Sequence, residues 1–379
     1  MYADRLLLPW LDCLRPAVPG LALHDVHTHT GAADPDGARC SADELLAALT
    51  LAQAHAVVFP LMERGGYRQA NDRVLAEAAR SRGRLAAFCR VDPNQEPVAE
   101  AERCLAAGAA GIKLHPRAER FTLTDPGVQA LAAHAHEQRV PIHVHAGRGI
   151  PALGRDALAL CAAYPQARIV LAHAAICDLA WIWRPAREQP NLLFDTAWWS
   201  PADLLALLRL VPPAQILFGS DAPYGTPATA ATVALRCALH AGLDADQIHG
   251  IAGGQLERLL AGADLLELGP PPPASVPPPG PLLERVFVLL AAALGRMMEA
   301  RPGGELLELA RLGCQVDPEA PEAPVLASVA ELLDRRTRYA SGAAPLDGPR
   351  TAGFHLVAVA ATVARTPNAP LPTPAAPGS

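Results

Sequence analysis

The sequence predicts an α/β protein: a (β/α)8 TIM barrel followed by a proline-rich linker and a small all-helical C-terminal region. Eight short runs rich in apolar residues recur at regular intervals between residues 21 and 223. Helical stretches separate these runs, and each run is apolar nearly throughout, as expected for parallel strands that are covered on both faces. Eight strand–helix units within about 240 residues fit the size of a closed barrel.

The expected strands are spaced so that one helix fits between neighbours. We place the strands at residues 21–29, 55–62, 84–92, 110–116, 140–147, 168–175, 191–198 and 215–223. Capping signals support the helices: SADE at 41–44 and DADQ at 244–247 have the capping-box pattern, and Ser200 precedes Pro201 at a helix start. An open doubly wound sheet is the alternative, but no glycine-rich phosphate motif follows the first strand.

The composition changes after residue 268, which we take as the end of the barrel domain (1–268). Residues 269–281 (GPPPPASVPPPGP) read as a proline-rich linker. Residues 282–365 are expected to be helical, either as a small domain or as an arm packed on the barrel, with helices at 282–300, 304–313, 323–340 and 351–365. Residues 366–379 are rich in proline and are expected to be disordered.

The composition also limits the classes of partner. A hydrophobic content of 51% supports a large core, and a net charge of −6 gives no basis for nucleic-acid binding. The eight cysteines are dispersed, which is typical of a reducing compartment. No apolar stretch approaches the length of about 20 residues that crosses a bilayer, and the N-terminus is a poor signal peptide. We expect a cytoplasmic protein that acts on a small molecule, with no nucleic-acid or membrane partner; a homo-oligomer is compatible with the sequence.

Polar side chains gather where the predicted strands end, which is where the active sites of such barrels lie. His27 and His29 are two residues apart on the first strand, so both rings point to one side, as two ligands of one metal would. The later strand ends add Lys113, His115, His143, His145, His173 and Asp221. Neutral imidazoles and a carboxylate suit zinc or another borderline divalent ion, which activates water at neutral pH. Asp221 is placed to take the proton of that water.

Several motifs in these strands resemble the amidohydrolase superfamily. They are HTH at 27–29, PIHVHAG at 141–147, LAHAA at 171–175 and FGSDAPYG at 218–225. GIKLHP at 111–116, LLFDTAWW at 192–199 and IAGGQLERLL at 251–260 narrow the resemblance to the amidohydrolase-related (family 2) branch. The resemblance covers residues 21–262. It departs from the family pattern at Ala175 and Gln255, neither of which is an expected ligand.

The resemblance implies a metal-dependent barrel enzyme and a specific ligand set. It implies His27, His29, His145 and Asp221 as metal ligands, with His173 beside the metal as acid, base or electrophile. Zn²⁺ is the metal expected first, and Mn²⁺ or Fe²⁺ are also compatible with these ligands. Glutamate is expected at the end of the fourth strand in the competing branch of metal-dependent deoxyribonucleases, whereas this chain has GIKLHP there.

Lys113 is the only lysine among 32 basic residues, so a role that arginine cannot fill is of interest. Three roles stay open. A carbamate of Lys113 would bridge two metals, an ammonium would hold a substrate carboxylate or polarise a carbonyl, and a structural ion pair would have no catalytic role. His143 precedes His145 by two residues on the same strand and lies deeper in the barrel. It is expected to be a hydrogen-bonded core histidine.

Substrate-binding candidates follow the strands. They are His115, Arg64 after the second strand, Arg148 after the fifth, Trp198 after the seventh and Tyr224 after the eighth. Three functions are compatible with these residues. The first is a metal-dependent hydrolase of a small-molecule amide, ester or lactone; the second is a non-oxidative decarboxylase of an unsaturated or aromatic carboxylic acid; the third is a catalytically silent barrel scaffold.

Overall fold

The structure is a computed structural model, and it describes residues 1–35, 37–273, 279–342 and 350–373. Eight parallel strands form one sheet in the order of the sequence. They are β1 (Leu23–Thr30), β2 (Ala54–Pro60), β3 (Leu85–Arg90), β4 (Gly111–Leu114), β5 (Pro141–Val144), β6 (Arg168–Leu171), β7 (Leu192–Asp195) and β8 (Ile216–Leu217). The predicted barrel of eight parallel strands is therefore confirmed.

Most strands end several residues before the predicted runs do. The clearest case is β8, which stops at Leu217 although the apolar run continues to residue 223. Beyond Leu217 the chain closes the ring against β1, where Val26 donates its backbone N–H to the carbonyl of Phe218 at 2.9 Å. A parallel bridge between Thr28 and Ala222 continues this contact. The residues after β8 thus lie beside β1 at the end of the barrel that carries the active site in this fold.

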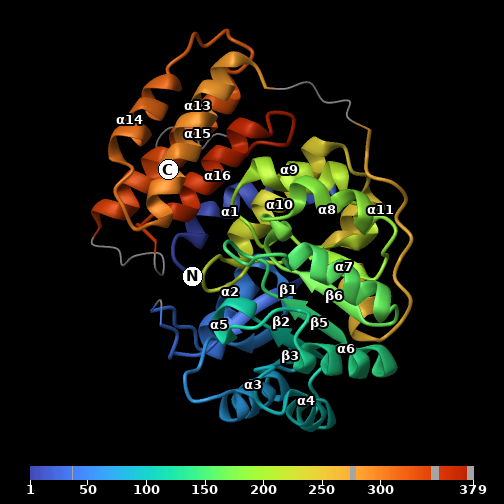
Figure 1. The fold of residues 1–379 in the computed structure, drawn as a ribbon. Coiled ribbons are helices and arrows are strands. Elements are labelled where there is room, and N and C mark those ends of the chain that lie inside the picture. Colours follow the sequence, from blue (N-terminus) through green and yellow to red (C-terminus); the bar gives the residue numbers. More distant parts are fainter. Residues whose placement is uncertain (36, 274–278, 343–349, 374–379) are drawn as a thin grey trace.

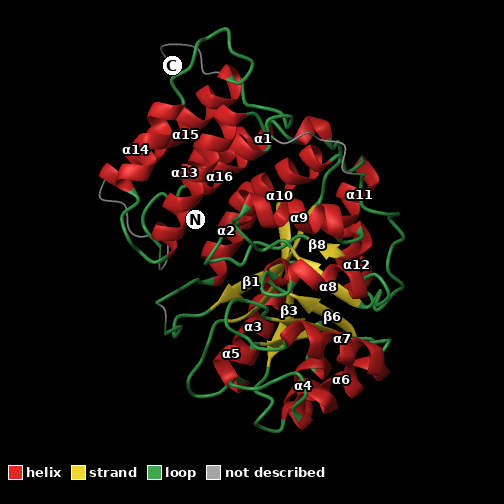
Figure 2. Ribbon diagram, turned by 45° about the horizontal axis from the view of Figure 1, so that its top comes forward, coloured by secondary structure: helices red, strands yellow, loops and turns green. Residues whose placement is uncertain are grey.

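Helices surround the strands (Figures 1 and 2). The barrel helices are α1 (Asp4–Asp12), α2 (Ala42–Ala52), α3 (Arg68–Arg80), α4 (Pro97–Ala106), α5 (Pro116–Glu119), α6 (Pro126–Gln138), α7 (Leu153–Ala163), α8 (Leu179–Ala186), α9 (Pro201–Leu210), α10 (Pro227–Ala241), α11 (Ala245–His249) and α12 (Gln255–Leu260). The two capping boxes are present, at Ser41 before α2 and at Asp244 before α11. Ser200 caps α9 as predicted, because its hydroxyl accepts the N–H of Asp203.

The C-terminal region consists of α13 (Pro281–Met298), α14 (Gly304–Gly313), α15 (Ala323–Ser341) and α16 (Phe354–Arg365), close to the predicted ranges. Of the two arrangements left open, the structure shows the arm packed on the barrel: these helices stand against one side of it, with α16 in contact with α10 and α9 (Figure 1). Every residue of α16 from Phe354 to Ala364 is buried. A helix that is apolar on all sides is a core element, so α16 is the centre of the interface between the bundle and the barrel.

Residues 366–370 differ from the predicted disordered tail. Arg236 of α10 is fully buried, and its guanidinium donates to the carbonyl of Thr366 at 3.0 Å and to that of Pro370 at 2.6 Å. A buried cation needs such acceptors, and the segment after α16 supplies them. The prediction of disorder is therefore wrong for residues 366–370, while residues 374–379 lie outside the described residues.

Two further observations concern the whole chain. All eight cysteines are free thiols, in agreement with the dispersed spacing in the sequence. Within the ranges that the structure describes, no helix has the length and apolar character needed to cross a membrane.

Candidate metal centre

Strand β1 brings His27 and His29 to the mouth of the barrel. The pairing of β1 with β2 shifts register between Asp25 and Thr28, which marks a β-bulge at this point. Bulges of this kind re-aim side chains and are common beside active sites. Asp25 holds the bulge in place, because its Oδ1 accepts the backbone N–H of His27 at 3.0 Å and that of Ser220 at 2.9 Å.

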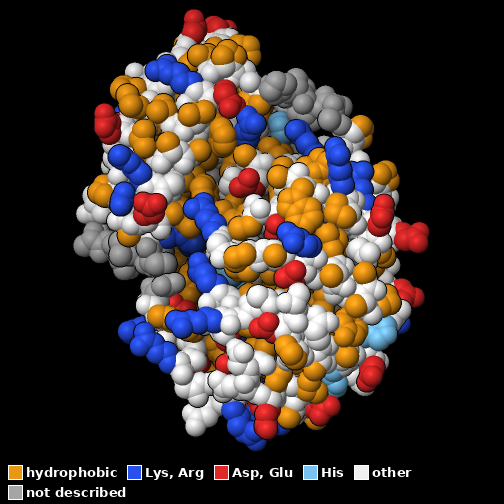
Figure 3. Space-filling model, viewed as in Figure 1, with side chains coloured by type: hydrophobic (Ala, Val, Ile, Leu, Met, Phe, Trp, Pro, Cys, Tyr) orange, Lys and Arg blue, Asp and Glu red, His pale blue; other side chains and the backbone are white. Residues whose placement is uncertain are grey.

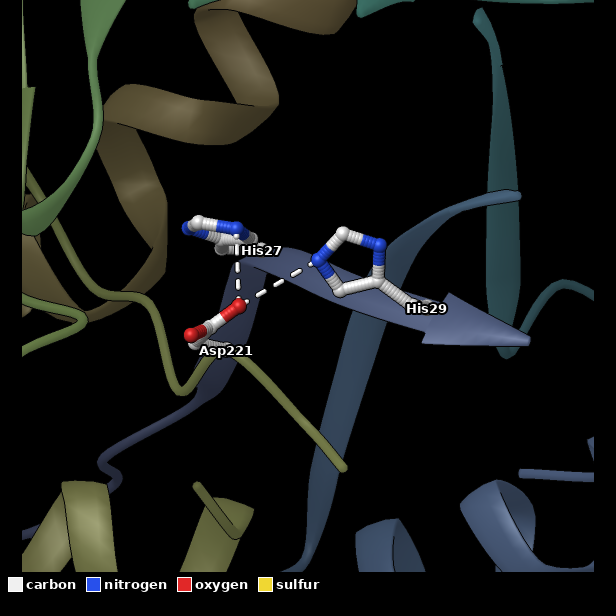
Figure 4. A group of neighbouring side chains, drawn as sticks. All are labelled: His27, His29 and Asp221. Carbon is white, nitrogen blue, oxygen red and sulfur yellow. Dashed lines mark hydrogen bonds and ion pairs between the residues drawn. The ribbon is translucent and has the colours of Figure 1, made fainter. Parts of the chain in front are cut away.

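Asp221 faces both histidines from the segment after β8 (Figure 4). Its Oδ1 lies 3.1 Å from Nε2 of His27 and 3.2 Å from Nε2 of His29. The backbone of Asp221 has a φ of 59°, and its N–H donates to the carbonyl of His27 at 2.8 Å. A left-handed non-glycine residue costs roughly 1–3 kcal/mol and persists only where its surroundings impose it. The strained conformation aims this carboxylate at the two imidazoles.

These three donor atoms fit one divalent ion. They all lie within 4.8 Å of one another, from buried His27 and His29 and half-buried Asp221. Ligands bound tetrahedrally to zinc at about 2.0–2.1 Å lie roughly 3.3 Å apart, which is close to the two measured separations of 3.1 and 3.2 Å. The residues therefore fit the metal that the donor chemistry indicates, without fixing which divalent ion it is.

The protonation states of His29 and Asp221 at neutral pH also suit a metal. Burial lowers the pKa of His29 to about 3, so its imidazole is neutral. Burial alone would raise the pKa of Asp221, but His27 and His29 outweigh this and hold it well below the ordinary value. Metal ligands must be neutral imidazoles and ionised carboxylates. His27 differs: burial and Lys113 lower its pKa, yet Asp221 and Asp195 outweigh them and raise it, so this ring must give up its second proton when it binds a metal.

Asp195, at the end of β7, anchors the group from behind. Its Oδ2 lies 2.8 Å from Nδ1 of His27 and 2.9 Å from Nε2 of His143, and its Oδ1 accepts the backbone N–H of His173 at 2.8 Å and of Ala197 at 2.9 Å. The carboxylate fixes a proton on Nδ1 of His27, which leaves Nε2 free to bind a metal. Such carboxylate–histidine pairs orient the ligands of many metal sites.

Lys113 lies beneath the group rather than in the cavity. It is fully buried, and its Nζ lies 2.8 Å from Nδ1 of His143 and 3.5 Å from Nε2 of His27. Burial lowers the pKa of Lys113 to about 7, although Asp221 and Asp195 oppose the shift. Among the described residues that line the cavity Lys113 is absent. Its position agrees with a role in the buried hydrogen-bond network or with a carbamate near the metal. An ammonium group at this position would have no direct contact with a substrate in the cavity.

His173 and His145 form a second pair beside the first. The backbone of His173 has a φ of 58°, and its Nδ1 lies 2.8 Å from the carbonyl of Ala197. Nδ1 must therefore donate, so Nε2 carries a lone pair and accepts from Nδ1 of His145 at 3.1 Å. Burial lowers the pKa of both rings.

His145 does not belong to the cluster of His27, His29 and Asp221 as the structure has it. Its Nε2 is buried and has no hydrogen-bond partner within the described part of the chain. An orphaned buried lone pair next to a metal cluster is compatible with a ligand, so the predicted role of His145 stays a prediction. His115 stacks on His145 with ring centroids 3.8 Å apart, and its Nδ1 accepts the N–H of Ala118 at the start of α5.

A cavity of about 710 Å³ opens above the metal centre. His29, His173 and Asp221 form part of its wall, together with four of the predicted substrate-binding residues: His115, Arg148, Trp198 and Tyr224. The Arg148 guanidinium lies 5.8 Å from the centroid of the Trp198 ring. The hydroxyl of Tyr224 donates to Oδ2 of Asp34 at 2.7 Å. This volume is typical of a small-molecule site.

Arg64 is a correction to the prediction. It is exposed in the turn after β2 and is not one of the described residues in the cavity wall, whereas Leu61 and Met62 from the same segment are. Arg64 is exposed to solvent, and the chain turns shortly after it at Gly66, where φ is 92°.

Two groups at the site, Asp195 and Arg90, are not among the residues predicted from the sequence. Asp195 carries a recognisable signal, since it is the last residue of β7 and thus a polar strand end like His27. Arg90 also ends a strand; it lines the cavity and pairs with buried Glu119 at 2.7 Å. Applying the strand-end rule to β3 and β7 would have found both.

Comparison with known proteins places the fold in a family. A family model described as amidohydrolase matches residues 24–261. A putative amidohydrolase from Staphylococcus aureus is similar at 15% identity with a TM-score of 0.53, and the alignment covers 64% of this chain and all of that one (100%). An amidohydrolase from Burkholderia multivorans is 17% identical with a TM-score of 0.52, over 63% of this chain and 99% of that one.

The 5-carboxyvanillate decarboxylase from Sphingomonas paucimobilis is similar to the same extent, at 16% identity and a TM-score of 0.51, over 64% of this chain and 99% of that one. At such identities these likenesses show the barrel fold alone. No curated protein matches this sequence. Because the family model spans well over half of the residues, this chain belongs to the amidohydrolase family.

Proposed function

We propose that this chain is a metal-dependent hydrolase of a small-molecule amide, ester or lactone. The observation that carries the proposal is the convergence of His27, His29 and Asp221, of which His29 and Asp221 line a cavity of about 710 Å³. A divalent ion held by these residues would polarise a carbonyl and activate water for attack. The cavity supplies the room for a substrate.

Two residues of the chain are in proton-accepting form where the water would attack. Asp221 is ionised, since its two histidine neighbours hold its pKa well below the ordinary value. The Nε2 lone pair of neutral His173 accepts the hydrogen bond from Nδ1 of His145, so His173 takes a proton only when that bond opens. Either group can take a proton from the attacking water and return it to the leaving group. Asp195 keeps both histidine-bearing segments in position, through the ring of His27 and the backbone N–H of His173.

A non-oxidative decarboxylation is the second candidate, and one observation favours it. Arg148 lies over Trp198 in the cavity wall, which offers a guanidinium and an aromatic face to an aromatic acid. The fold is shared with the 5-carboxyvanillate decarboxylase from Sphingomonas paucimobilis. In this reaction the same proton-transfer groups would deliver a proton to carbon instead of taking one from water.

Isotope labelling separates the two reactions. The full chain, loaded with zinc, is incubated in ¹⁸O-water with a panel of small lactones, methyl esters and amides, and in deuterated water with 5-carboxyvanillate and 2,6-dihydroxybenzoate. Hydrolysis places ¹⁸O in the product acid, whereas decarboxylation releases CO2 and places deuterium on carbon. Carbon dioxide release without ¹⁸O uptake would replace the first proposal by the second.

Asp221→Ala is the matching variant. We expect turnover to fall by about 10²–10⁴-fold, because the variant removes a proton-transfer group and a metal ligand together. Bound metal per chain, measured by elemental analysis, is expected to fall as well. Asp264→Asn is the control, because Asp264 is exposed and pairs with Arg139 far from the cavity wall. Full activity and full metal content in Asp221→Ala would contradict both candidate functions.

A further inference from the structure

The C-terminal helices reach the cavity above the metal centre. Met298 at the end of α13 and Arg350, which precedes α16, are part of its wall. A recess of about 50 Å³ beside it is bounded by Trp198 and Trp199 of the barrel and by Phe354 at the start of α16. The family model ends at residue 261, so these contributions come from a part of the chain that the family match does not include.

Packing holds Arg350 in this wall. Its Cζ lies 4.9 Å from the centroid of the Phe354 ring, and its Nε lies 3.2 Å from Sδ of Met298. The Phe354 ring in turn meets Trp199 edge to face, with centroids 6.0 Å apart. Trp199 contacts Trp198, whose ring lies beneath the Arg148 guanidinium. A continuous row of rings and guanidiniums therefore joins α16 to the barrel loop after β5.

The cavity wall is rich in arginine. Five of the described lining residues are arginines, whereas two, Asp34 and Asp221, are acidic; the arginines are Arg90, Arg117, Arg120, Arg148 and Arg350. The buried Arg90 is neutralised by Glu119. Within the described residues, no carboxylate lies within ion-pair distance of Arg117, Arg120 or Arg148. Figure 3 shows blue side chains gathered along the junction of the C-terminal helices and the barrel.

We propose that the C-terminal region completes the substrate site, and that Arg350 acts with Arg117 and Arg120 to bind a second anionic group of the substrate, a carboxylate or a phosphate. The inference rests on the proposed function in one respect: the reacting group of the substrate lies beside His27, His29 and Asp221. Guanidinium forks bind carboxylate and phosphate oxygens in pairs. Because Arg117, Arg120 and Arg148 have no carboxylate partner within the described residues, a substrate with two anionic groups would gain charge-assisted hydrogen bonds that a substrate with one would not.

Binding of matched acids tests the proposal without turnover. Valerate and glutarate have five carbons each and differ by one carboxylate, and 4-phosphonobutyrate replaces that carboxylate by a phosphonate. Their affinities for the zinc-loaded full chain are measured by titration calorimetry. We expect glutarate or 4-phosphonobutyrate to bind at least about tenfold more tightly than valerate, because a charge-assisted hydrogen-bonded pair contributes on the order of 1.4 kcal/mol or more. The tighter of the two identifies the group as carboxylate or phosphate.

The variant Arg350→Gln assigns the preference to the C-terminal region. It should lower the affinity for the preferred dianion about five- to tenfold and leave valerate binding unchanged. Arg285→Gln, at an exposed position of α13 outside the cavity wall, removes the same charge and should change neither. Because Arg350 also packs on Phe354, Arg350→Lys is a second variant that keeps the charge and loses the fork; we expect a two- to threefold loss for the dianion alone.

Two results would overturn the inference: equal binding of all three acids by the parent chain, or a dianion preference that both Arg350 variants retain in full. Neither would touch the proposed function, which fails separately if the parent chain binds no metal or if Asp221→Ala keeps its turnover. Metal content measured on the same samples therefore tells the two failures apart.

Discussion

The barrel mouth and the C-terminal interface are equally buried and are stabilised in opposite ways. At the mouth, one carboxylate, Asp195, meets two imidazoles and two backbone N–H groups within 2.8 to 2.9 Å. At the interface, every residue of α16 from Phe354 to Ala364 is buried, and most of them are aliphatic. The first region depends on directional contacts between a few groups, and the second on the fit of many apolar groups.

This difference teaches what each region contributes to function. A polar network fixes protonation and orientation, and removing one member leaves its partners unsatisfied. An apolar interface fixes only where one body lies on another, and it tolerates change in proportion to the volume lost. The barrel mouth therefore sets the chemistry, whereas α16 sets the position of Met298 and Arg350 in the cavity wall.

The largest expected effect separates stability from metal binding. Leu356→Ala empties a fully buried position of α16 and should lower the free energy of unfolding by about 2–5 kcal/mol. Metal affinity of the folded protein should stay the same, because no group at the mouth is touched. Urea unfolding followed by tryptophan fluorescence and by circular dichroism measures the change. Leu312→Ala, at a position of α14 that is 55% exposed, is the control and should have little effect.

The same experiment tests whether the two regions unfold together. We expect one transition, coincident by both probes, since α16 packs on α10 and buried Arg236 ties α10 to residues 366–370. A separate early unfolding transition in Leu356→Ala would show that the C-terminal helices are an independent folding unit. The barrel and the C-terminal helices would then be two domains.

The second expected effect is a loss of metal affinity at the barrel mouth. Asp195→Asn keeps the shape of the side chain and removes the charge that holds the proton on Nδ1 of His27. Loss of such a ligand-orienting carboxylate lowers metal affinity by about 10–100-fold, which competition with a chelator measures. Asp264→Asn, at an exposed aspartate, should keep the parent affinity. Unchanged metal affinity in Asp195→Asn would mean that β7 supports the fold and not the metal centre.

The barrel is well predicted from the sequence because its signals are local. Apolar runs, helix caps and the polar residues at strand ends all lie within a few positions of one another, and the strand order follows from the alternation of strands and helices. The same strand-end rule predicts that His27, His29 and Asp221 lie together, as they do. The predicted ends of strands such as β8 are wrong. The backbone hydrogen bonds from residues 218–222 to β1 depend on how the barrel closes, which the local pattern does not contain.

The remaining site residues could not be predicted from local pattern. Arg350 reaches the cavity through the docking of α16, and docking of a uniformly apolar helix has no directional signal in the sequence. Arg64 is predicted in the site from its place after a strand, but it is exposed and lies outside the described cavity wall. Order at residues 366–370 likewise depends on a buried arginine more than a hundred positions away.

The smallest expected effect lies in α10, which packs against α16. His240 of α10 is buried, and burial with the nearby cations Arg209, Arg236 and Arg365 lowers its pKa to about 4. An unfolded histidine binds its proton near pH 6.5, so between about pH 6.5 and pH 4 the unfolded chain holds a proton that the folded chain lacks, and stability falls as the pH falls. His240→Gln should remove about 1 kcal/mol of the stability lost between pH 7 and pH 5, after allowance for solvent screening. Urea unfolding of both proteins at the two pH values measures this difference, with the exposed His55→Gln as the control. An identical pH dependence in parent and His240→Gln would mean that His240 does not contribute to the acid sensitivity of the fold.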